Sequence, residues 1–417
     1  MKRFLLRFTF VYLLLYLLPF LLGSLPLLKP VGTAYESLWS SFGPWLGKQA
    51  FALEIVVRKT GSGDTAYAFM RILCSLFLAV VAGLAWTFLD RKRSNDARIR
   101  EWLRVYVRFS LATAMIVYGA HKVFSAQFGT PGLDRLLGTF GNASPMGLLW
   151  TFMGFSRGYT LFTGLAEMLG GILLISRRTT LLGALISSGL LVNVVLLNFF
   201  YDVPVKQFSV HLLAMAVLLT LPDLQRLADL FLFNRKVQSA EIRPLFQGAS
   251  AHRAALVLRT VFIAGLSVYW LYSSYKIDVE MSDYPSRTPF YGIWEVDEYV
   301  VNGQVQPPLI TDASRWRWLV FEVPGYLSVH TMRQERPHYY ALELDSNRKR
   351  LVLTDAKAKD PKSRSVLSYQ QPGPEILTVA GAIDGQKITA RLHRIDESKF
   401  QLVSRGFHWI SEWPFNR

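Results

Sequence analysis

The hydrophobic positions of this chain are concentrated in long apolar segments within roughly its first 280 residues. Segments of about 20 apolar residues are long enough to cross the hydrocarbon core of a membrane as a helix. We therefore predict seven membrane-spanning helices, at residues 4–28, 67–89, 102–125, 158–175, 179–200, 207–221 and 254–275. Pro19 and Pro26 are expected to kink or end the first of these helices.

The N-terminal segment has basic residues followed by an apolar run, which is also the pattern of a signal peptide. Its apolar part is longer than the usual signal-peptide core and no A-x-A site follows, so a retained first span is favoured. A connection at residues 29–66 is rich in Trp, Phe and Gly. We expect this connection to lie at the membrane interface, where Trp is enriched.

From about Ser282 onward, hydrophobic and polar residues alternate as they do in strands with one buried face. Turn sequences such as Asn302-Gly303 and Asp384-Gly385 separate eight or nine short antiparallel strands. A meander of this kind favours a small closed barrel, because closure removes exposed sheet edges. The same pattern is also compatible with another type of β barrel or with a β sandwich. The expected strands are residues 291–301, 317–323, 326–332, 338–345, 349–355, 365–369, 376–383, 386–395 and 399–405.

The opening Gly292-Ile293-Trp294 of this region resembles the Gly-x-Trp start of lipocalin-like barrels. The resemblance implies that Trp294 plugs one end of the barrel and that an arginine, here Arg405, packs on it. A Trp in a first strand is also commonly a plain core residue. The aromatic C-terminal segment from Arg405 onward either docks on the spans or the membrane surface, or closes the barrel.

The fold class predicted from these patterns is an α-helical integral membrane bundle followed by an all-β soluble domain. Two N-terminal transmembrane helices and an interfacial loop occupy residues 1–101, and a four-helix membrane core occupies residues 102–221. A cytoplasmic linker and the seventh helix follow at 222–281. The extracytoplasmic barrel-like domain covers residues 282–417.

Composition agrees with a membrane protein, because 51% of the 417 residues are hydrophobic. The net charge of +16 arises from Lys and Arg that flank the apolar segments. This pattern favours a topology signal over nucleic-acid binding, which we do not expect, and over a specific anionic partner. With a cytoplasmic N-terminus, the cytoplasmic segments hold twice as many Lys and Arg residues as the outer connections. We therefore predict a multi-pass protein of the bacterial inner membrane with an extracytoplasmic C-terminal domain.

The single cysteine, Cys74, excludes an intrachain disulfide and is expected to be a small core or lipid-facing residue.

Glu167 is a carboxyl in the middle of an apolar segment, where an ionisable group is costly and often functional. Small and hydroxylated residues within helical reach of Glu167 allow another helix to approach closely. We predict that Glu167 points into the bundle, either as a proton-accepting group, as a partner for Lys122, or as a structural group that locks helices together. The neighbouring small residues are Thr160, Thr163, Gly164, Gly170 and Gly171.

Asn193 and Asn198 lie five positions apart, about 140° around a helix, so they cannot face the same point. Asn193, with Gly189 one turn away, is the better interior candidate. An interhelical hydrogen bond is the structural alternative for either residue.

His121 and Lys122 are adjacent on one segment, so only one of them is expected to face the core. With the predicted topology these residues, Glu167, Asn193 and His211 all fall in the outer half of the membrane, which predicts an outward-opening polar vestibule. Hydrogen-bond donors near an apolar wall suit a quinone headgroup, with Phe199, Phe200 and Tyr201 as the aromatics. Two histidines at matching depth are also a haem pattern, but no further motif supports haem. Lys122 reaching toward the interface within a plain polar network is the structural alternative.

The segment from Tyr201 to Lys206 forms a compact exit in which Pro204 stops the fifth helix. Asp202 is expected to cap the sixth helix or to pair with Lys206. The other histidines show no metal-ligand spacing, and the chain contains no P-loop, GxSxG, HExxH or dinucleotide fingerprint. We therefore predict no metal site.

Residues 102–221 resemble the DoxX-like family of four-helix membrane proteins. The resemblance rests on Tyr118-Gly119-Ala120-His121-Lys122, on the run 167–174 (EMLGGILL) and on Arg177-Arg178-Thr179. The family includes a subunit of a thiosulfate:quinone oxidoreductase, so the resemblance implies a redox or quinone-linked role. This chain adds two spans before the core, one after it, and a β domain.

These features support three functional hypotheses. The first is a quinone- or lipophilic-ligand-binding membrane subunit of an oxidoreductase with a redox partner protein. Glu167, His121 and Lys122 would then be catalytic, and the binding residues would be Asn193, His211, Tyr201, Asp202 and Lys206. The second is a non-enzymatic scaffold or lipid-binding protein whose β domain recruits a partner. The third is a lipid-modifying or carboxylating enzyme that depends on His121 and Lys122. The sequence leaves open whether the protein is an enzyme.

Overall fold

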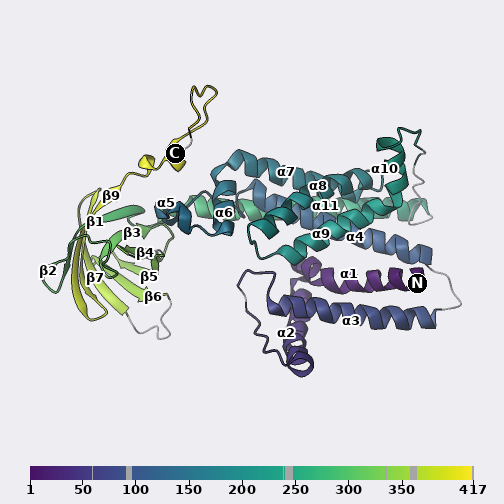
Figure 1. The fold of residues 1–417 in the computed structure, drawn as a ribbon, viewed down its shortest axis with the longest axis horizontal. Coiled ribbons are helices and arrows are strands. Elements are labelled where there is room, and N and C mark those ends of the chain that lie inside the picture. Colours follow the sequence, from purple (N-terminus) through teal and green to yellow (C-terminus); the bar gives the residue numbers. More distant parts are fainter. Residues whose placement is uncertain are drawn as a thin grey trace. The chain divides into compact units, whose positions relative to one another are not determined.

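The computed structural model of the protein describes residues 1–58, 60–90, 96–237, 239, 248–333, 336–356 and 364–415. It divides the chain into two compact units. The first unit contains Met1–Phe128 and Ser156–Tyr275, and the second contains Gly129–Phe155 and Lys276–Arg417. The first is helical and the second carries the strands (Figure 1). The predicted basic loop at 91–95 and the linker residues 240–247 lie outside the described residues.

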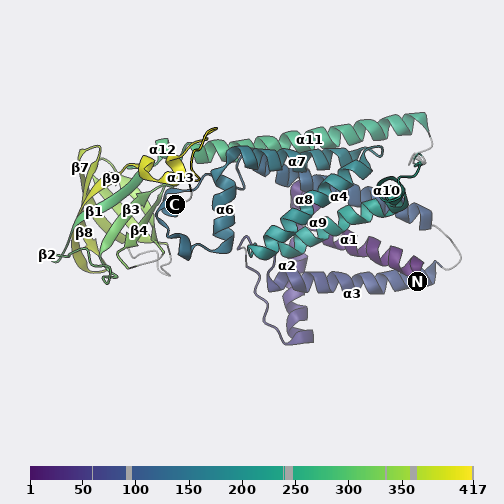
Figure 2. The same ribbon diagram turned by 45° about the horizontal axis from the view of Figure 1, so that its top comes forward.

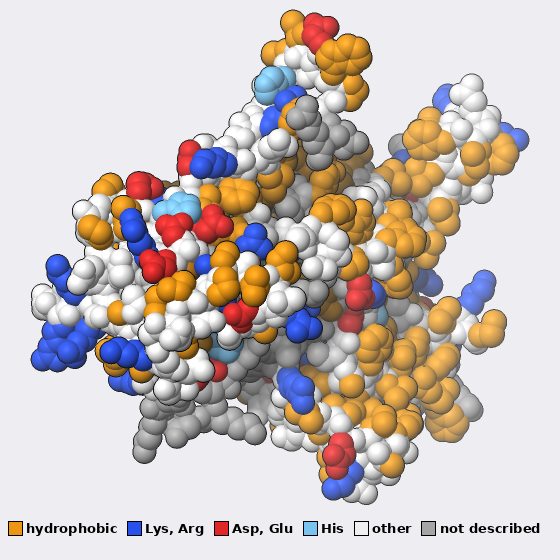
Figure 3. Space-filling view, turned by 60° about the vertical axis from the view of Figure 1, so that its left-hand side comes forward, with side chains coloured by type: hydrophobic (Ala, Val, Ile, Leu, Met, Phe, Trp, Pro, Cys, Tyr) orange, Lys and Arg blue, Asp and Glu red, His pale blue; other side chains and the backbone are white. Residues whose placement is uncertain are grey.

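Six helices of the described residues are long and apolar enough to cross a membrane. Their outward-facing side chains are largely hydrophobic, whereas charged side chains gather on the strands (Figure 3). The chain is therefore a multi-pass membrane protein, and six of the seven predicted spans are confirmed. These helices are α1 (Lys2–Ser24), α3 (Ala66–Leu89), α7 (Arg157–Ile175), α8 (Thr180–Phe200), α9 (Lys206–Thr220) with its continuation η3 (Leu221–Asp223) and α10 (Leu224–Phe231), and α11 (Ala249–Ser282).

The remaining predicted span corresponds to α4 (Asp96–Val123), which is less apolar than those six helices. Its 28 residues correspond to about 42 Å, which is long enough to cross. Arg108 of α4 donates to the carbonyls of Leu174 and Ile175 at one end of α7, and Lys122 reaches Glu167 further along. The two helices therefore run antiparallel side by side. Because α4 is largely buried among other helices, it needs fewer lipid-compatible side chains than they do.

The connection at 29–66 is more ordered than predicted, because it contains the helix α2 (Lys29–Phe51). Trp39 of α2 packs against Met70 and Cys74 of α3, so Cys74 is a small core residue. The first helix continues through Pro19 and ends at Ser24, just before Leu25 and Pro26. On the outside of the bundle lies α11, which contacts α4 through Phe262 and Trp270 (Figure 2).

The second unit contains a closed antiparallel barrel of eight strands, as predicted. The strands pair in the order β1-β3-β4-β5-β6-β7-β8-β9, and β9 pairs back with β1. A two-residue strand, β2 (Gln304–Val305), forms a short hairpin with β1. The barrel strands are β1 (Gly292–Val301), β3 (Trp316–Phe321), β4 (Tyr326–Thr331), β5 (His338–Asp345), β6 (Arg350–Asp355), β7 (Arg364–Gly373), β8 (Ile376–Ile383) and β9 (Gln386–Ile395).

The ninth predicted strand, residues 399–405, is wrong. These residues form the end of η4 (Glu397–Lys399) and a single helical turn, α13 (Gln401–Ser404). The pairing of β9 with β1 leaves no free barrel edge for another strand. Arg405 lies over the ring of Phe415, with 4.0 Å from its guanidinium carbon to the ring centroid, rather than in a strand beside Trp294.

Trp294 belongs to the barrel core, where 1% of its surface is exposed. Its indole N–H donates to the carbonyl of Phe290, at 2.7 Å. Phe290 in turn packs edge-on against Phe321 and Tyr369. Aromatic side chains therefore fill the barrel around Trp294.

Residues 129–155 belong to the same compact unit as the barrel. Leu133 of α5 (Leu133–Leu137) packs with Ile293 and Val320, and Asp134 accepts hydrogen bonds from Ser328 Oγ at 2.6 Å and His330 Nε2 at 2.7 Å. A segment that connects two spans and the domain after the last span therefore lie on the same side of the membrane. The other short helices of this unit are η2 (Phe140–Asn142), α6 (Pro145–Phe155) and α12 (Tyr284–Arg287).

Candidate functional site

The Lys122–Glu167 ion pair lies inside the helical unit. Lys122 Nζ is 2.5 Å from Glu167 Oε1, and 7% and 5% of the two residues' surfaces are exposed. The second carboxylate oxygen, Oε2, is buried and accepts no hydrogen bond from any described residue. Glu167 therefore points into the bundle and pairs with Lys122, which is one of the arrangements predicted for it.

Glycines bring the backbones of α4 and α7 together beside this pair. A Cβ atom added to Gly119 would lie 2.6 Å from the carbonyl oxygen of Gly164. One added to Gly164 would lie 2.7 Å from the Gly119 oxygen and 2.9 Å from Lys122 Cβ. On the same helix, an added Cβ at Gly171 would lie 3.0 Å from the Ala112 oxygen. The small-residue face predicted around Glu167 is thus the contact face, and it leaves little space between the two backbones.

His121 lies on a different side of α4 from Lys122. Its Nδ1 donates to the carbonyl of Val117 at 2.7 Å, and its ring lies 5.2 Å from the ring of Trp270 in α11. The expectation that only one of the two adjacent residues is buried in the core is confirmed, and that residue is Lys122.

His211 lies in a cluster with two tyrosines of α1. Its Nδ1 donates to the carbonyl of Gln207 at 2.6 Å, so the Nε2 of the neutral ring accepts from the Tyr12 hydroxyl, also at 2.6 Å. The ring of Tyr16 stacks on the imidazole with centroids 3.9 Å apart. This part-buried Tyr–His pair is hydrogen-bonded on both sides of the imidazole.

The prediction that Asn193 faces the interior is wrong, because Asn193 is exposed and Asn198 is buried. The buried face of α8 includes Ala184, Ser187 and Leu191. Asn198 follows Leu191 by two helical turns and lies on that face, whereas Asn193 lies about 200° away from Leu191. A nearby glycine was a misleading signal, since an added Cβ at Gly189 would meet nothing within 4 Å.

At the exit of α8, Lys206 Nζ pairs with Asp202 Oδ1 at 2.7 Å. Asp202 does not cap α9. That cap comes from Asp64, whose two carboxylate oxygens accept the backbone N–H groups of Lys206 and Gln207 at 2.7 and 3.1 Å. Tyr201 is the partly buried residue that directly follows α8. The exit of α8 is therefore held by hydrogen bonds between helices. Asp64, which supplies the cap, is 142 residues away from Lys206 in the sequence.

These positions do not assemble into the single polar pocket that the sequence predicted. Lys122 and Glu167 meet each other, His121 contacts α11, His211 contacts α1, and Asn193 faces outward. Residue depth along each helix was the basis of the prediction. Helix rotation decides which side chains face one another, and the tertiary packing sets that rotation.

The barrel contains a cavity of about 310 Å³ that the sequence did not reveal. Its lining combines apolar and aromatic side chains with hydroxyl, carboxyl and imidazole groups. The residues are Tyr299, Ser314, Trp316, Val329, Thr331, His338, Tyr340, Leu353, Asp355, Ser365, Ile383, Asp384, Gln386 and Ile388. Strand alternation would have identified most of the inward positions, but not the space between them.

Polar contacts within this cavity are built from neighbouring strands. His338 Nε2 of β5 lies 3.2 Å from Asp355 Oδ1 of β6, and the His338 ring lies 4.6 Å from that of Tyr340. Burial, followed by the nearby carboxylates of Asp384 and Asp355, raises the pKa of Tyr340 to about 12. Tyr299 and Trp316 stack with centroids 5.6 Å apart. The lining therefore has an aromatic wall next to groups that can accept hydrogen bonds.

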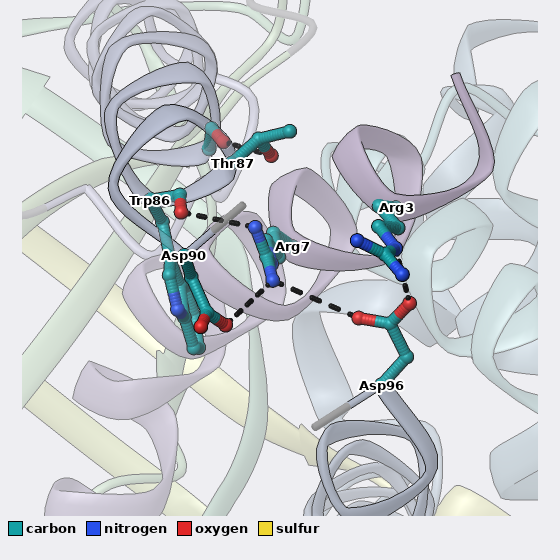
Figure 4. Close-up of polar contacts among 7 residues, drawn as sticks. Arg3, Arg7, Trp86, Thr87, Asp90 and Asp96 are labelled. Atoms are coloured by element: carbon teal, nitrogen blue, oxygen red, sulfur yellow. Dashed lines mark hydrogen bonds and ion pairs between the residues drawn. The ribbon is translucent and has the colours of Figure 1, made fainter. Parts of the chain in front are cut away.

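The helical unit also holds a buried arginine network that sequence reasoning missed. Arg7, which is fully buried, donates to the carbonyl of Trp86 at 2.9 Å and to Asp90 Oδ2 at 2.8 Å (Figure 4). Asp96 lies 3.7 Å from Arg7 and 3.1 Å from Arg3. The signal was available, because Arg7 interrupts an apolar segment just as Glu167 does. Arg108 gives the same signal in α4.

No group of three or more His, Cys, Asp and Glu residues in the described part of the chain is placed to hold a metal ion.

The chain is 35% identical over 135 residues to a Bacillus subtilis (strain 168) protein named "Uncharacterized protein YwoB". The alignment covers 84% of that protein and 32% of this chain. The chain belongs to the family of YwoB. About two thirds of the chain therefore lies outside the part that it shares with YwoB. No family model matches the chain, and no solved structure matches it.

Proposed function

We propose that this protein binds a small lipophilic or amphipathic molecule in its barrel while its helices hold it in the bacterial inner membrane. In the proposed orientation the N-terminus is cytoplasmic and the barrel is extracytoplasmic, as the distribution of Lys and Arg favours. The observation that carries the proposal is the cavity of about 310 Å³ inside the closed barrel.

The size and lining of this cavity support ligand binding. Ligand pockets have volumes of about 300–1,000 Å³ and combine an apolar wall with a few polar groups that orient the ligand. Trp316, Val329 and Leu353 belong to the apolar part of the lining, and His338 and Asp355 belong to the polar part. A molecule with an apolar body and a hydrogen-bonding head group suits such a site.

The contacts around Glu167 favour the barrel over the membrane core as the place of binding. Lys122 and Glu167 already satisfy each other's charge, and the Gly119–Gly164 contact brings the two backbones together beside them. A carboxylate in this setting is suited to holding α4 against α7. We therefore propose a structural role for the pair within a DoxX-like core.

The barrel proposal is tested with one cavity-filling variant and one control on the same strand. Ser365→Phe places a ring in the cavity, whereas Ser368→Phe adds the same ring at an exposed position of β7. The full-length protein is purified from native membranes, and the molecules bound to it are identified by mass spectrometry. We expect the wild type and Ser368→Phe to retain the same molecule and Ser365→Phe to lose it by at least about tenfold. The proposal fails if nothing discrete is retained, or if Ser365→Phe retains it equally.

A second candidate is a quinone-binding membrane subunit of an oxidoreductase, and the Tyr12–His211 hydrogen bond favours it. A Tyr12 hydroxyl that turned from His211 Nε2 to a quinone carbonyl would supply the hydrogen-bond donor, and the Tyr16 ring would supply the aromatic wall. A redox partner protein would then exchange electrons with the bound quinone.

The quinone candidate is tested by adding a short-chain quinone to the full-length protein in lipid nanodiscs. We expect Tyr12→Phe to weaken binding about tenfold. The control is Tyr106→Phe. It removes a hydroxyl that donates to the carbonyl of Leu14 on α1, the helix that carries Tyr12, and it should leave quinone binding unchanged. Equal affinities for the wild type and Tyr12→Phe would reject this site.

A further inference from the structure

A second cavity, of about 250 Å³, lies in the helical unit at the end where α1 begins, α3 ends and α4 begins. Its walls are mostly apolar and aromatic, and two charged residues belong to the lining. The residues are Phe10 of α1, Trp86 of α3, Asp90 directly after α3, and Arg98, Ile99 and Trp102 of α4.

The carboxylates at this cavity already have cationic partners. Arg7 Nη2 lies 2.8 Å from Asp90, and the Arg7 guanidinium is fully buried, so it stays with that carboxylate (Figure 4). Asp96 lies close to Arg3 and also to Arg7. Two arginines thus balance two carboxylates.

Arg98 is the surplus charge of the cavity. Its side chain is exposed, and no described carboxylate forms an ion pair with it. The site therefore carries a net positive charge beside an apolar wall. A ligand with a negatively charged head and a hydrocarbon tail complements both features.

The position of the cavity along the helices identifies the source of such a ligand. Leu89 is the last residue of α3, an apolar helix of membrane-spanning length, so Asp90 and Arg98 lie where the hydrocarbon core gives way to headgroups. Trp86 and Trp102 are of the residue type that is enriched at this level of a bilayer. Lipid is the amphiphile that is always present there.

We propose that this cavity binds one anionic phospholipid. Arg98 contacts its phosphate, and the first part of an acyl chain lies against Phe10, Trp86 and Trp102. The Arg7–Asp90 pair forms the base of the site and makes Asp90 unavailable to the ammonium of a zwitterionic headgroup. The site selects for the net charge of the lipid, because the surplus charge at the cavity is positive.

The test uses the full-length protein in nanodiscs made from equal parts of phosphatidylglycerol and phosphatidylethanolamine. Native mass spectrometry after release counts the lipids retained by each molecule. We expect the wild type to retain one phosphatidylglycerol and Arg98→Gln to reduce that retention about tenfold. Arg100→Gln removes an exposed charge two positions away, outside the cavity lining, and should leave retention unchanged.

A second variant, Trp102→Leu, tests the apolar wall and should also reduce retention while leaving the preference for phosphatidylglycerol. Equal loss in Arg98→Gln and Arg100→Gln would mean diffuse attraction between the helix ends and anionic lipid, and would overturn the site. Equal retention of the two lipids, or preferential retention of phosphatidylethanolamine, would overturn the anionic specificity.

Discussion

At the residue scale, the Lys122–Glu167 pair shows how a charge can be kept inside a membrane bundle. Each charged group removes the other's need for water, and the close approach of Gly119 and Gly164 excludes solvent around them. Arg108 uses another device, since two of its guanidinium nitrogens donate to carbonyls at the C-terminal end of α7. Both devices join α4 to α7.

We predict that Glu167→Gln lowers the free energy of unfolding by about 3–5 kcal/mol, because it leaves the buried Lys122 ammonium without a negative counter-charge. The measurement is thermal or denaturant unfolding of the purified protein in detergent. Asp202→Asn breaks an exposed pair instead and should cost less than about 1 kcal/mol. Replacing Lys122 and Glu167 together by methionine should recover most of the lost stability. Equal effects of Glu167→Gln and Asp202→Asn would contradict this account.

At the same scale, the two asparagines show a limit of sequence reasoning. Both Asn193 and Asn198 lie on a helix that is apolar on every side, so hydropathy contains no information about which face is buried. The packing of Gly183 and Ala184 against neighbouring residues sets the rotation of α8 and places Asn198 inside. Glu167 was easier to predict, because glycines and threonines mark one side of its helix.

At the element scale, α4 is the helix around which the membrane unit is built. Its residues from Val107 to Ala120 are mostly buried, and it contacts α1, α7, α9 and α11. An interior helix can carry Arg108 and Lys122 because neighbouring helices supply their partners. The same burial explains why hydropathy alone underestimates α4.

We predict that Gly164→Ala destabilises the bundle by about 1–3 kcal/mol, because the added Cβ would meet the backbone of α4. Gly189→Ala is the matched control on α8, where the added Cβ would meet nothing within 4 Å. That change should be neutral or stabilising by up to about 1 kcal/mol, since Ala is the better helix former. Unfolding midpoints of the two variants in one detergent check the contrast, and a larger loss for Gly189→Ala would reject it.

The strands show what alternation can and cannot predict. Alternation identified all eight barrel strands, because each of them has one face toward the barrel core. It also assigned a strand to residues 399–405, where a local pattern of apolar residues is compatible with a short helical turn. The pairing of β9 with β1 joins residues about 100 positions apart, so a local sequence pattern cannot predict it.

At the scale of the whole molecule, the segment between α4 and α7 is part of the barrel unit. Asp134 of this segment accepts hydrogen bonds from the side chains of Ser328 and His330. Glu322 accepts hydrogen bonds from the backbone N–H groups of Leu133 and Asp134. Burial, followed by the nearby charge of Asp134, raises the pKa of Glu322. Two stretches of chain that are far apart in sequence must therefore fold on the same side of the membrane.

We predict that both stretches are accessible from the extracytoplasmic side. In a Cys74→Ser background, cysteines placed at Asn142 and Ser346 should react with a membrane-impermeant maleimide in spheroplasts. A cysteine at Arg178, in the bend between α7 and α8, should react only after lysis. Reaction of Asn142→Cys and Ser346→Cys from opposite sides would contradict the fold, and reaction of both only after lysis would reverse the orientation.

The amino-acid sequence alone was enough to predict the membrane helices, the eight barrel strands and the change from helices to strands near residue 282. Hydrophobic length and periodicity are local properties that each segment carries without its neighbours. The tertiary structure decided which polar groups meet: Lys122 with Glu167, Asp64 with the start of α9, and Arg7 with Asp90. It also decided where cavities remain, because helix rotation and barrel closure depend on contacts between residues that are distant in sequence.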